Sequence, residues 1–244
     1  MKIAKSNKII HGLWIGKNLS NLELLTINSF IYHGHEFHLW VYDVLETVIP
    51  STVVLKDANE IMPCEKVFHY ENTNQFGHGK GSVAGFSDIF RYKLLYEKGG
   101  WWVDMDITCL RPFDFEDPYV FREHGELKIV GNVLKCPAKS QIMKSCYEEA
   151  LATVDSKNKN WFKPIEILNT NLIKYNLEEY IQPNISFPDH FGLVQLFKGF
   201  KIKIPETIYF IHWLNEEWRN NNIDKSKFKI KSSYGQYMIK YGVV

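Results

Sequence analysis

Hydrophobic and polar positions in the first part of the chain follow a strand, helix, strand pattern. An apolar run predicts a strand over residues 8–15. Helical spacing of apolar residues after Ser20, a suitable N-cap, predicts a helix that runs to Tyr32 and ends at Gly34. Aromatic and β-branched residues predict a second strand over residues 35–42. A unit of this kind predicts parallel strands joined by a right-handed crossover.

The rest of the chain continues to mix helical and strand patterns. A polar, glycine-rich stretch over residues 71–81 predicts a loop, and an apolar stripe at helical spacing predicts a helix over 81–98. We further expect helices over residues 139–154 and 164–180, and strands over 53–55, 127–134, 208–213 and 227–231. Because no repeat, low-complexity segment or linker interrupts the pattern, we expect a single α/β domain over residues 1–244.

Composition and charge narrow the class of protein. The chain is 45% hydrophobic and 23% charged, which is ordinary for a soluble globular protein. A net charge of +1 excludes a global field that favours nucleic acid, so no nucleic-acid partner is expected. The segment from Arg219 onward is basic, and it forms either a solvated face or a surface that meets anionic lipid or a phosphate-bearing acceptor. Nothing in the sequence indicates an oligomeric state.

Cysteine usage and the N-terminal sequence bear on location. The four cysteines lack paired metal-type spacing and indicate reduced, partly buried thiols. The first residues lack an apolar signal core, and no stretch approaches the ~18 apolar residues of a membrane span. We therefore expect a cytoplasmic protein, with peripheral contact at the inner face of the membrane through the basic C-terminal tail.

The acidic pair Asp104 and Asp106 is the most informative chemical feature of the chain. The expected helix ends at Gly99 and Gly100, and a short apolar strand then carries both carboxylates. Side chains at i and i+2 on a strand point to the same face, so both can converge on one cation. Mg²⁺ and Mn²⁺ prefer oxygen ligands and commonly bind carboxylates together with substrate phosphates.

Several interpretations of this pair compete. An EF-hand loop is excluded, because Cys109 and Phe115 stand where glycine and glutamate are needed. The run from Asp104 to Thr108 resembles the nucleophile motif of haloacid-dehalogenase-type phosphohydrolases, although the later aspartates are isolated. A dinucleotide-binding turn over residues 79–84 lacks the strand that should precede it. In a nucleotide-sugar site, the pair would hold a cation that offsets charge on a departing diphosphate.

Longer motifs favour the last interpretation. Residues 86–106 contain Ser-Asp-x-x-Arg, a leucine and Gly-Gly-Trp-Trp-Val-Asp-Met-Asp, and they resemble the signature of DXD-containing sugar-binding glycosyltransferases. That group includes family-32 enzymes and the glucosylating domains of large clostridial toxins. Residues 10–16 resemble the first strand of the family, and residues 211–218 resemble its C-terminal histidine and tryptophan region.

The resemblance implies a GT-A-type, Rossmann-like α/β domain with a central mixed, mostly parallel sheet flanked by helices. Its nucleotide-sugar-binding part would cover about residues 1–135, and its acceptor and lid part about 136–244. The implied activity is metal-dependent, retaining transfer from a nucleotide sugar, UDP-sugar favoured over GDP-sugar, with Mn²⁺ or Mg²⁺. We expect a saccharide or glycolipid acceptor in surface polysaccharide or lipopolysaccharide synthesis. A phosphohydrolase that uses Asp104 and Asp106, and a non-catalytic carbohydrate-binding module, remain the alternatives.

Site residues follow from the same resemblance. The catalytic residues would be Asp88, Arg91 and Asp106, and the metal ligands Asp104, Asp106 and His212. The nucleotide sugar would be bound by Leu13, Trp14, Asp88, Arg91, Trp102, Asp104 and Trp218. Trp14 would stack on the base, and Trp218 would cover the diphosphate from a lid. The chain departs from the family pattern at Trp102, where the family has tyrosine, and at Glu217, where it has serine.

Overall fold

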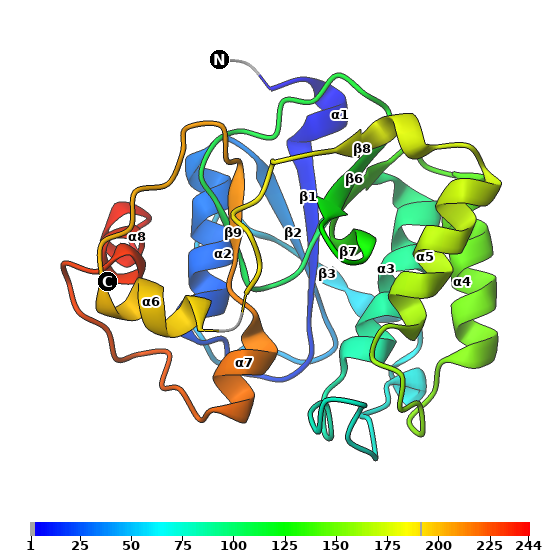
Figure 1. The fold of residues 1–244 in the computed structure, drawn as a ribbon, viewed down its shortest axis with the longest axis horizontal. Coiled ribbons are helices and arrows are strands. Elements are labelled where there is room, and N and C mark those ends of the chain that lie inside the picture. Colours follow the sequence, from blue (N-terminus) through cyan, green and yellow to red (C-terminus); the bar gives the residue numbers. More distant parts are fainter. Residues whose placement is uncertain (1–2, 191) are drawn as a thin grey trace. The chain divides into compact units, whose positions relative to one another are not determined.

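The computed structural model describes residues 3–190 and 192–244, and Figure 1 labels most of its helices and strands. The chain forms two compact units. The first comprises Met1–Lys56, Asp104–Asp114 and Asn184–Val244, and the second comprises Asp57–Val103 and Phe115–Pro183. Each unit thus combines segments from both sides of residue 135, and the division of a single domain near that residue stays a prediction.

The first unit begins with the predicted strand, helix, strand pattern. After a short helix α1 (Lys5–Lys8), strand β1 (Ile9–Trp14) pairs in parallel with β2 (Glu36–Val41). Helix α2 (Asn21–Tyr32) connects them, and its N-terminus has the expected cap. Ser20 Oγ accepts the Leu22 N–H at 3.3 Å, while Glu23 Oε2 accepts the Ser20 N–H at 2.7 Å. This capping box satisfies N–H groups that the helix itself cannot pair.

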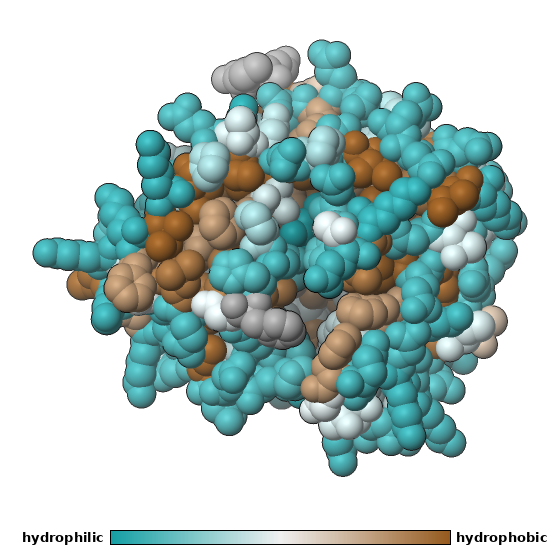
Figure 2. All heavy atoms as spheres, viewed as in Figure 1, coloured by the Kyte–Doolittle hydropathy of each residue, from teal (hydrophilic) through white to brown (hydrophobic). Residues whose placement is uncertain are grey.

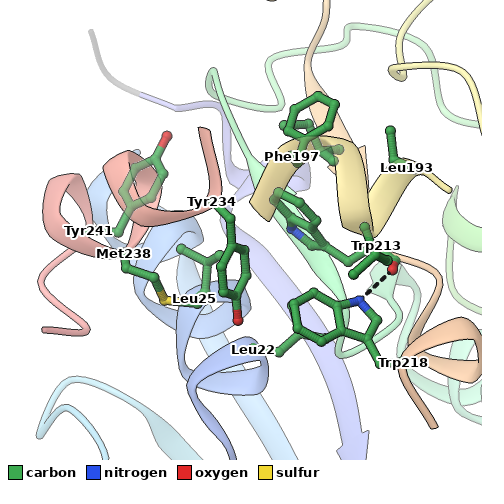
Figure 3. Close-up of a cluster of buried hydrophobic side chains, with 11 residues drawn as sticks. Leu22, Leu25, Leu193, Phe197, Trp213, Trp218, Tyr234, Met238 and Tyr241 are labelled. Atoms are coloured by element: carbon green, nitrogen blue, oxygen red, sulfur yellow. Dashed lines mark hydrogen bonds between the residues drawn. The ribbon is translucent and has the colours of Figure 1, made fainter. Parts of the chain in front are cut away.

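The C-terminal part of the first unit packs around a shared hydrophobic core. Strand β5 (Ile107–Cys109) pairs antiparallel with β9 (Phe210–His212), and three helices follow or precede β9: α6 (Leu193–Gly199), α7 (Asn215–Asn220) and α8 (Ser233–Lys240). Figure 3 shows the core that these helices share with α2, including Leu22, Phe197, Trp213, Trp218 and Tyr234. Residues distant in sequence are therefore fixed to one another by buried aromatic contacts.

The second unit packs helices against strands that are mostly paired antiparallel. Strand β7 (Lys128–Cys136) pairs antiparallel with β4 (Gly100–Val103) and with β6 (Val120–His124), and β6 pairs in parallel with β8 (Ile181–Gln182). Helix α4 (Gln141–Thr153) packs against α3 (Ala84–Lys98) and α5 (Lys163–Lys174), and α5 also contacts β7. Strand β3 (Val54–Asp57) belongs to the first unit up to Lys56, and 3₁₀ turns of the second unit lie at Ala58–Glu60, Cys64–Lys66 and Glu178–Tyr180.

Gly99 ends helix α3 in a conformation that suits glycine. Its φ is 67°, a region that L side chains rarely adopt. A Cβ at this position would also lie 2.4 Å from the backbone nitrogen of Ala138. The double glycine of the motif therefore has a structural reason at its first position, independent of any ligand.

The expected mixed α/β fold is confirmed, with three local corrections. Residues 227–231 form no strand, because carbonyls in this segment accept hydrogen bonds from Ser232 and Gln236 around the start of α8. The helix expected to reach residue 180 ends at Lys174, where Tyr175 N–H bonds back to Asn171. Helices α6, α7 and α8 and strand β6 were not expected.

The structure also describes the cysteines and the lengths of the helices. All four cysteines are free, and three of them, Cys109, Cys136 and Cys146, are buried. Burial raises the pKa of the Cys109 thiol well above its ordinary value, so it stays protonated. Within residues 3–190 and 192–244, no helix has both the length and the apolar character needed to cross a bilayer.

Candidate functional site

The acidic pair lies in a turn rather than on a strand. Strand β4 ends at Val103, β5 begins at Ile107, and Met105 and Asp106 form the turn between them. The expected strand geometry of the pair is therefore wrong. The backbone bends here because Thr26 Oγ1 donates to the Met105 carbonyl at 2.9 Å, and the Trp213 N–H donates to the Asp106 carbonyl at 2.9 Å.

Gly12 explains how this turn packs. A Cβ at position 12 would lie 2.7 Å from Met105 Sδ, closer than side chains tolerate. The glycine in the N-terminal motif thus makes room for the methionine between the two aspartates. Two motifs that lie about ninety residues apart in sequence are coupled by one steric requirement.

Asp106 and His212 meet in the first unit, as the motifs predict. Asp106 is only 6% exposed, and its Oδ2 accepts the backbone N–H of Asn215 at 2.7 Å. His212 Nε2 lies 3.3 Å from the same oxygen, and His212 Nδ1 lies 3.0 Å from Asp189 Oδ2. His212 therefore bridges two carboxylates. No sequence pattern selects Asp189, which stands alone among prolines and aromatics.

The bridge determines the charge of its members. Burial alone lowers the pKa of His212, but Asp189 and Asp106 outweigh it and raise the pKa to about 10. Burial raises the pKa of Asp106, and the neighbouring His212 charge and hydrogen bonds leave it below its usual value. Both groups are therefore charged at neutral pH. An imidazolium has no free lone pair, so His212 could bind a cation only after it loses a proton.

An open groove of about 660 Å³ lies beside this bridge in the first unit. Trp14 and Trp218, from opposite ends of the chain, both line it. Its other lining residues are mainly polar: Ser20, Asn21, Asn215, Arg219, Asn222, Ile223, Asp224, Lys225 and Ser226. The volume is in the range of small-molecule sites, about 300–1,000 Å³.

The two tryptophans are held differently. Trp14 is half-buried, and its Nε1 donates to the Asn18 carbonyl at 3.1 Å, so part of its ring faces the groove. Trp218 is 1% exposed and belongs to the core in Figure 3, where its Nε1 donates to the Trp213 carbonyl at 2.8 Å. Trp218 is therefore anchored in the core while its edge lines the groove. Its proposed contact with a diphosphate stays a prediction.

Asn215 connects the groove to Asp106 and is the second residue that sequence analysis missed. Its backbone N–H binds Asp106, and its side-chain Oδ1 is buried without a hydrogen-bond partner among the described residues. A buried amide oxygen of this kind can bind a cation. The residue lies inside the C-terminal motif at 211–218, which could have drawn attention to it.

The donor set beside the groove fits a hard divalent cation. Asp106 and Asn215 supply oxygen atoms, which Mg²⁺ and Mn²⁺ prefer. Over the described part of the chain, no three His, Cys, Asp or Glu side chains gather into a closed metal cage. A cation that takes its remaining ligands from a substrate needs no such cage. Asp104 follows β4 directly and is half-buried, and its role as a ligand stays a prediction.

The second unit contains the other predicted catalytic residues. Asp88 and Arg91, three residues apart, form an ion pair on one face of α3, and their role toward a nucleotide sugar stays a prediction. Arg91 is 3% exposed, and its Nη1 donates to the Gly131 carbonyl at 2.6 Å. Its guanidinium carbon lies 5.7 Å from the centroid of the buried Trp102 ring. Trp102 thus packs on the arginine, which is fixed from several sides.

Two further expected residues have clear surroundings. Leu13 is 7% exposed on β1, opposite Trp40 of β2 in the strand register. Glu217 replaces the family serine, and its Oε1 accepts the Gly192 N–H at 2.9 Å. Its Oε2 is buried and has no hydrogen-bond partner among the described residues. The nucleotide-binding role of Leu13 remains untested.

Comparison with known families agrees with the motifs. Residues 28–123 match the family described as "Glycosyltransferase sugar-binding region containing DXD motif". The match includes Asp88, Arg91, Asp104 and Asp106. This part of the chain is similar to the sugar-binding region of DXD-type glycosyltransferases. The enzyme class that the sequence predicts, a glycosyltransferase, is thereby confirmed, and the alternatives based on the acidic pair alone lose their support.

One solved structure supports the expected fold. The structure titled "PaToxG Glycosyltransferase" has 15% sequence identity and a TM-score of 0.51, and the match covers 69% of this chain and 68% of that one. A second structure, of a doubly substituted protein described only as a transferase, has 10% identity and a TM-score of 0.44, over 73% and 88% of the two chains. Among curated proteins, none matches.

Proposed function

We propose that the chain transfers a sugar from a nucleotide sugar, UDP-sugar favoured, to a saccharide or glycolipid acceptor with retention of configuration. The proposal includes dependence on Mn²⁺ or Mg²⁺ and a place in surface polysaccharide or lipopolysaccharide synthesis. One observation supports it above others. The Asp106 carboxylate is held by Asn215, which also lines a groove that has Trp14 and Trp218 in its walls.

The groove residues suit a nucleoside diphosphate. The half-buried Trp14 ring offers an apolar face on which a base can stack. Lys225 and Arg219 bring positive charge to the groove lining, and their partners Glu23 and Glu216 hold them in place. Such cations favour the charge of a diphosphate.

Asp106, Asn215 and Asp104 would hold the cation. When bound, it would supply positive charge that stabilises the departing diphosphate. Asn215 fixes the Asp106 carboxylate through its backbone N–H, so the carboxylate does not have to reorganise on binding. His212 keeps the surroundings of Asp106 electrically balanced, and Asp189 orients the His212 ring.

Asp88 and Arg91 would act on the sugar and phosphate. Their ion pair, the Gly131 carbonyl and Trp102 fix the guanidinium, so Arg91 can present the same face to a ligand each time. Retention without a covalent glycosyl-enzyme intermediate follows from the family resemblance.

The deciding experiment measures UDP release from a panel of UDP- and GDP-sugars with Mn²⁺. We expect Asp106→Asn, which keeps the side-chain shape, to lower turnover by at least about 100-fold, the usual loss when one stabilising group is removed. Asp155→Asn, an exposed aspartate in the second unit, is the matched control and should keep full activity. Thermal unfolding of both variants checks the fold.

Other outcomes would contradict the proposal in different ways. Wild-type turnover in excess EDTA would refute metal dependence. Hydrolysis of phosphate monoesters without sugar transfer would favour the phosphohydrolase. If neither nucleotide sugar nor Mn²⁺ raised the unfolding temperature, the fold would serve as a non-catalytic module, since a ligand that binds only the native state must stabilise it.

A further inference from the structure

A compact surface on the first unit combines unpaired lysines with exposed hydrophobic side chains. We call it the lysine patch, and it consists of Phe200, Lys201, Lys203, Lys229, Ile230 and Lys231. Two segments far apart in sequence form it. The Ser233 N–H donates to the Phe200 carbonyl at 2.8 Å, and the Ile202 N–H donates to Ser233 Oγ at 2.7 Å. These bonds place residues 200–203 beside residues 229–233.

The four lysines of the patch carry charge that the protein does not neutralise. All four are exposed, and none forms an ion pair within the described part of the chain. Other basic residues near the C-terminus differ. Arg219 pairs with Glu216, Lys225 with Glu23, and Lys227 with Asp224. Apart from Lys240, which donates to the Tyr241 hydroxyl, the basic tail therefore divides into a paired part beside the groove and an unpaired part in the patch.

Two large hydrophobic side chains lie among these lysines. Phe200 is 64% exposed and Ile230 is 66% exposed. Lys229 Nζ lies 5.9 Å from the Phe200 ring centroid, which shows how closely charge and apolar surface are mixed. Figure 2 shows exposed hydrophobic side chains among hydrophilic ones over the region of α6 and α8. The adjacent Phe228 packs against the core, so the exposure of its neighbours does not come from a loose segment.

We infer that the lysine patch docks on an anionic lipid bilayer. Lysines attract anionic headgroups, and apolar side chains between them enter the boundary between headgroups and acyl chains. A polyanion without an apolar part would use the lysines but would leave Phe200 and Ile230 in water. The presence of both kinds of side chain in one patch therefore selects the bilayer. The inference does not depend on the proposed donor or metal.

The test is co-sedimentation of the whole chain with two kinds of vesicle. One contains phosphatidylcholine alone, and the other also contains about 30 mol% phosphatidylserine, which is anionic. We expect the protein to bind only the anionic vesicles. It should be released in about 0.5 M NaCl, because salt at this concentration screens the attraction between exposed lysines and anionic headgroups. Changing all four patch lysines to glutamine should weaken binding by at least about 100-fold, since each lysine near the surface contributes about fivefold.

Two matched variants separate the contributions. Phe200→Ser with Ile230→Ser leaves the charge unchanged and should also weaken binding. The control changes four exposed lysines of the second unit to glutamine and so removes the same charge elsewhere: Lys98, Lys157, Lys159 and Lys174. It should bind like the wild type. Release of UDP in solution should stay unchanged in the patch variants, which distinguishes a failure of this inference from a failure of the proposed enzyme.

Four results would overturn the inference. The first is equal binding to neutral and anionic vesicles. The second is equal loss of binding in the control variant, which would show an effect of net charge alone. The third is binding to single-stranded DNA or heparin without binding to anionic vesicles. The fourth is a serine variant that binds vesicles as tightly as the wild type. Unfolding temperatures of all variants exclude loss of fold as the cause.

Discussion

Gly131 offers a way to disturb Arg91 without changing any charged residue. A Cβ at position 131 would lie 2.7 Å from the guanidinium carbon of Arg91 and 2.7 Å from its Nη2. Exposed arginines would swing aside, but Arg91 is 3% exposed and is held by Asp88, the Gly131 carbonyl and Trp102. We therefore predict that Gly131→Ala is destabilising.

The size of the effect follows from these contacts. Ordinary contact begins at 3.4 Å, so the guanidinium must move by about 0.7 Å, the difference from 2.7 Å. Overpacking of a buried site costs about 1–3 kcal/mol. If the displacement also breaks the hydrogen bond to the Gly131 carbonyl, a further ~1.5–3 kcal/mol is lost. Each kcal/mol lowers the midpoint by about 2–4 °C in a chain of this length.

Thermal unfolding of a small set of variants tests this argument. Gly125→Ala is the control, because a Cβ there meets nothing within 4 Å. It should be neutral or slightly stabilising, since alanine reduces the entropy of the unfolded chain. Adding Arg91→Ala should relieve the crowding, so the cost of Gly131→Ala should shrink in that background. The reasoning is refuted if Gly131→Ala is as stable as Gly125→Ala, or if its cost is unchanged without the Arg91 side chain.

Two further predictions concern the first unit. His35 donates through Nδ1 to the Asn7 carbonyl at 2.9 Å and accepts the Phe113 N–H through Nε2 at 3.0 Å, and burial lowers its pKa from 6.5 to about 4 although Asn7 and Asp114 oppose this. Because the unfolded chain binds a proton at a higher pH than the folded chain, the free energy of unfolding should fall by up to about 3 kcal/mol between pH 6.5 and 4. Urea unfolding should show a weaker dependence of this free energy on pH for His35→Gln. Parallel curves for the variant and the wild type would contradict this prediction. Thr108→Val should leave the buried indole Nε1–H of Trp213, which lies 2.7 Å from Thr108 Oγ1, without an acceptor and cost about 1–3 kcal/mol. Thr108→Ser keeps the acceptor and should cost less, so a valine variant more stable than the serine variant would disprove the role of this bond.

Sequence patterns correctly predicted the elements that are determined by residues close together in the sequence. The strand, helix, strand start of the chain was correct because apolar periodicity and the Ser20 cap act within a few residues. The alternation over residues 227–231 misled, because Phe228 faces the core while neighbouring carbonyls bind the start of α8. Helix α8 itself begins at a capping serine, Ser232, whose Oγ accepts the Gly235 N–H at 3.2 Å. That signal is present in the sequence directly after residues 227–231, but no helix was predicted from it.

The candidate site divides in the same way. Motif spacing identified Asp106 and His212, and they do meet. Asp189 and Asn215 were missed because their contacts depend on tertiary approach, and no spacing rule relates Asp189 to His212 across 23 residues. The turn at Met105 was also unpredictable from local sequence, since the partner that bends it, Thr26, lies 79 residues away.

The cap of helix α2 has a consequence for dynamics. Glu23 is 1% exposed, and besides accepting the Ser20 N–H it pairs through Oε1 with Lys225 Nζ at 2.6 Å. One carboxylate thus closes the first turn of a helix and anchors a wall of the groove. Opening of that turn must release Lys225, so amide exchange at the start of α2 and occupancy of the groove are thermodynamically linked. The helix end is, in effect, a reporter of whether the groove is filled.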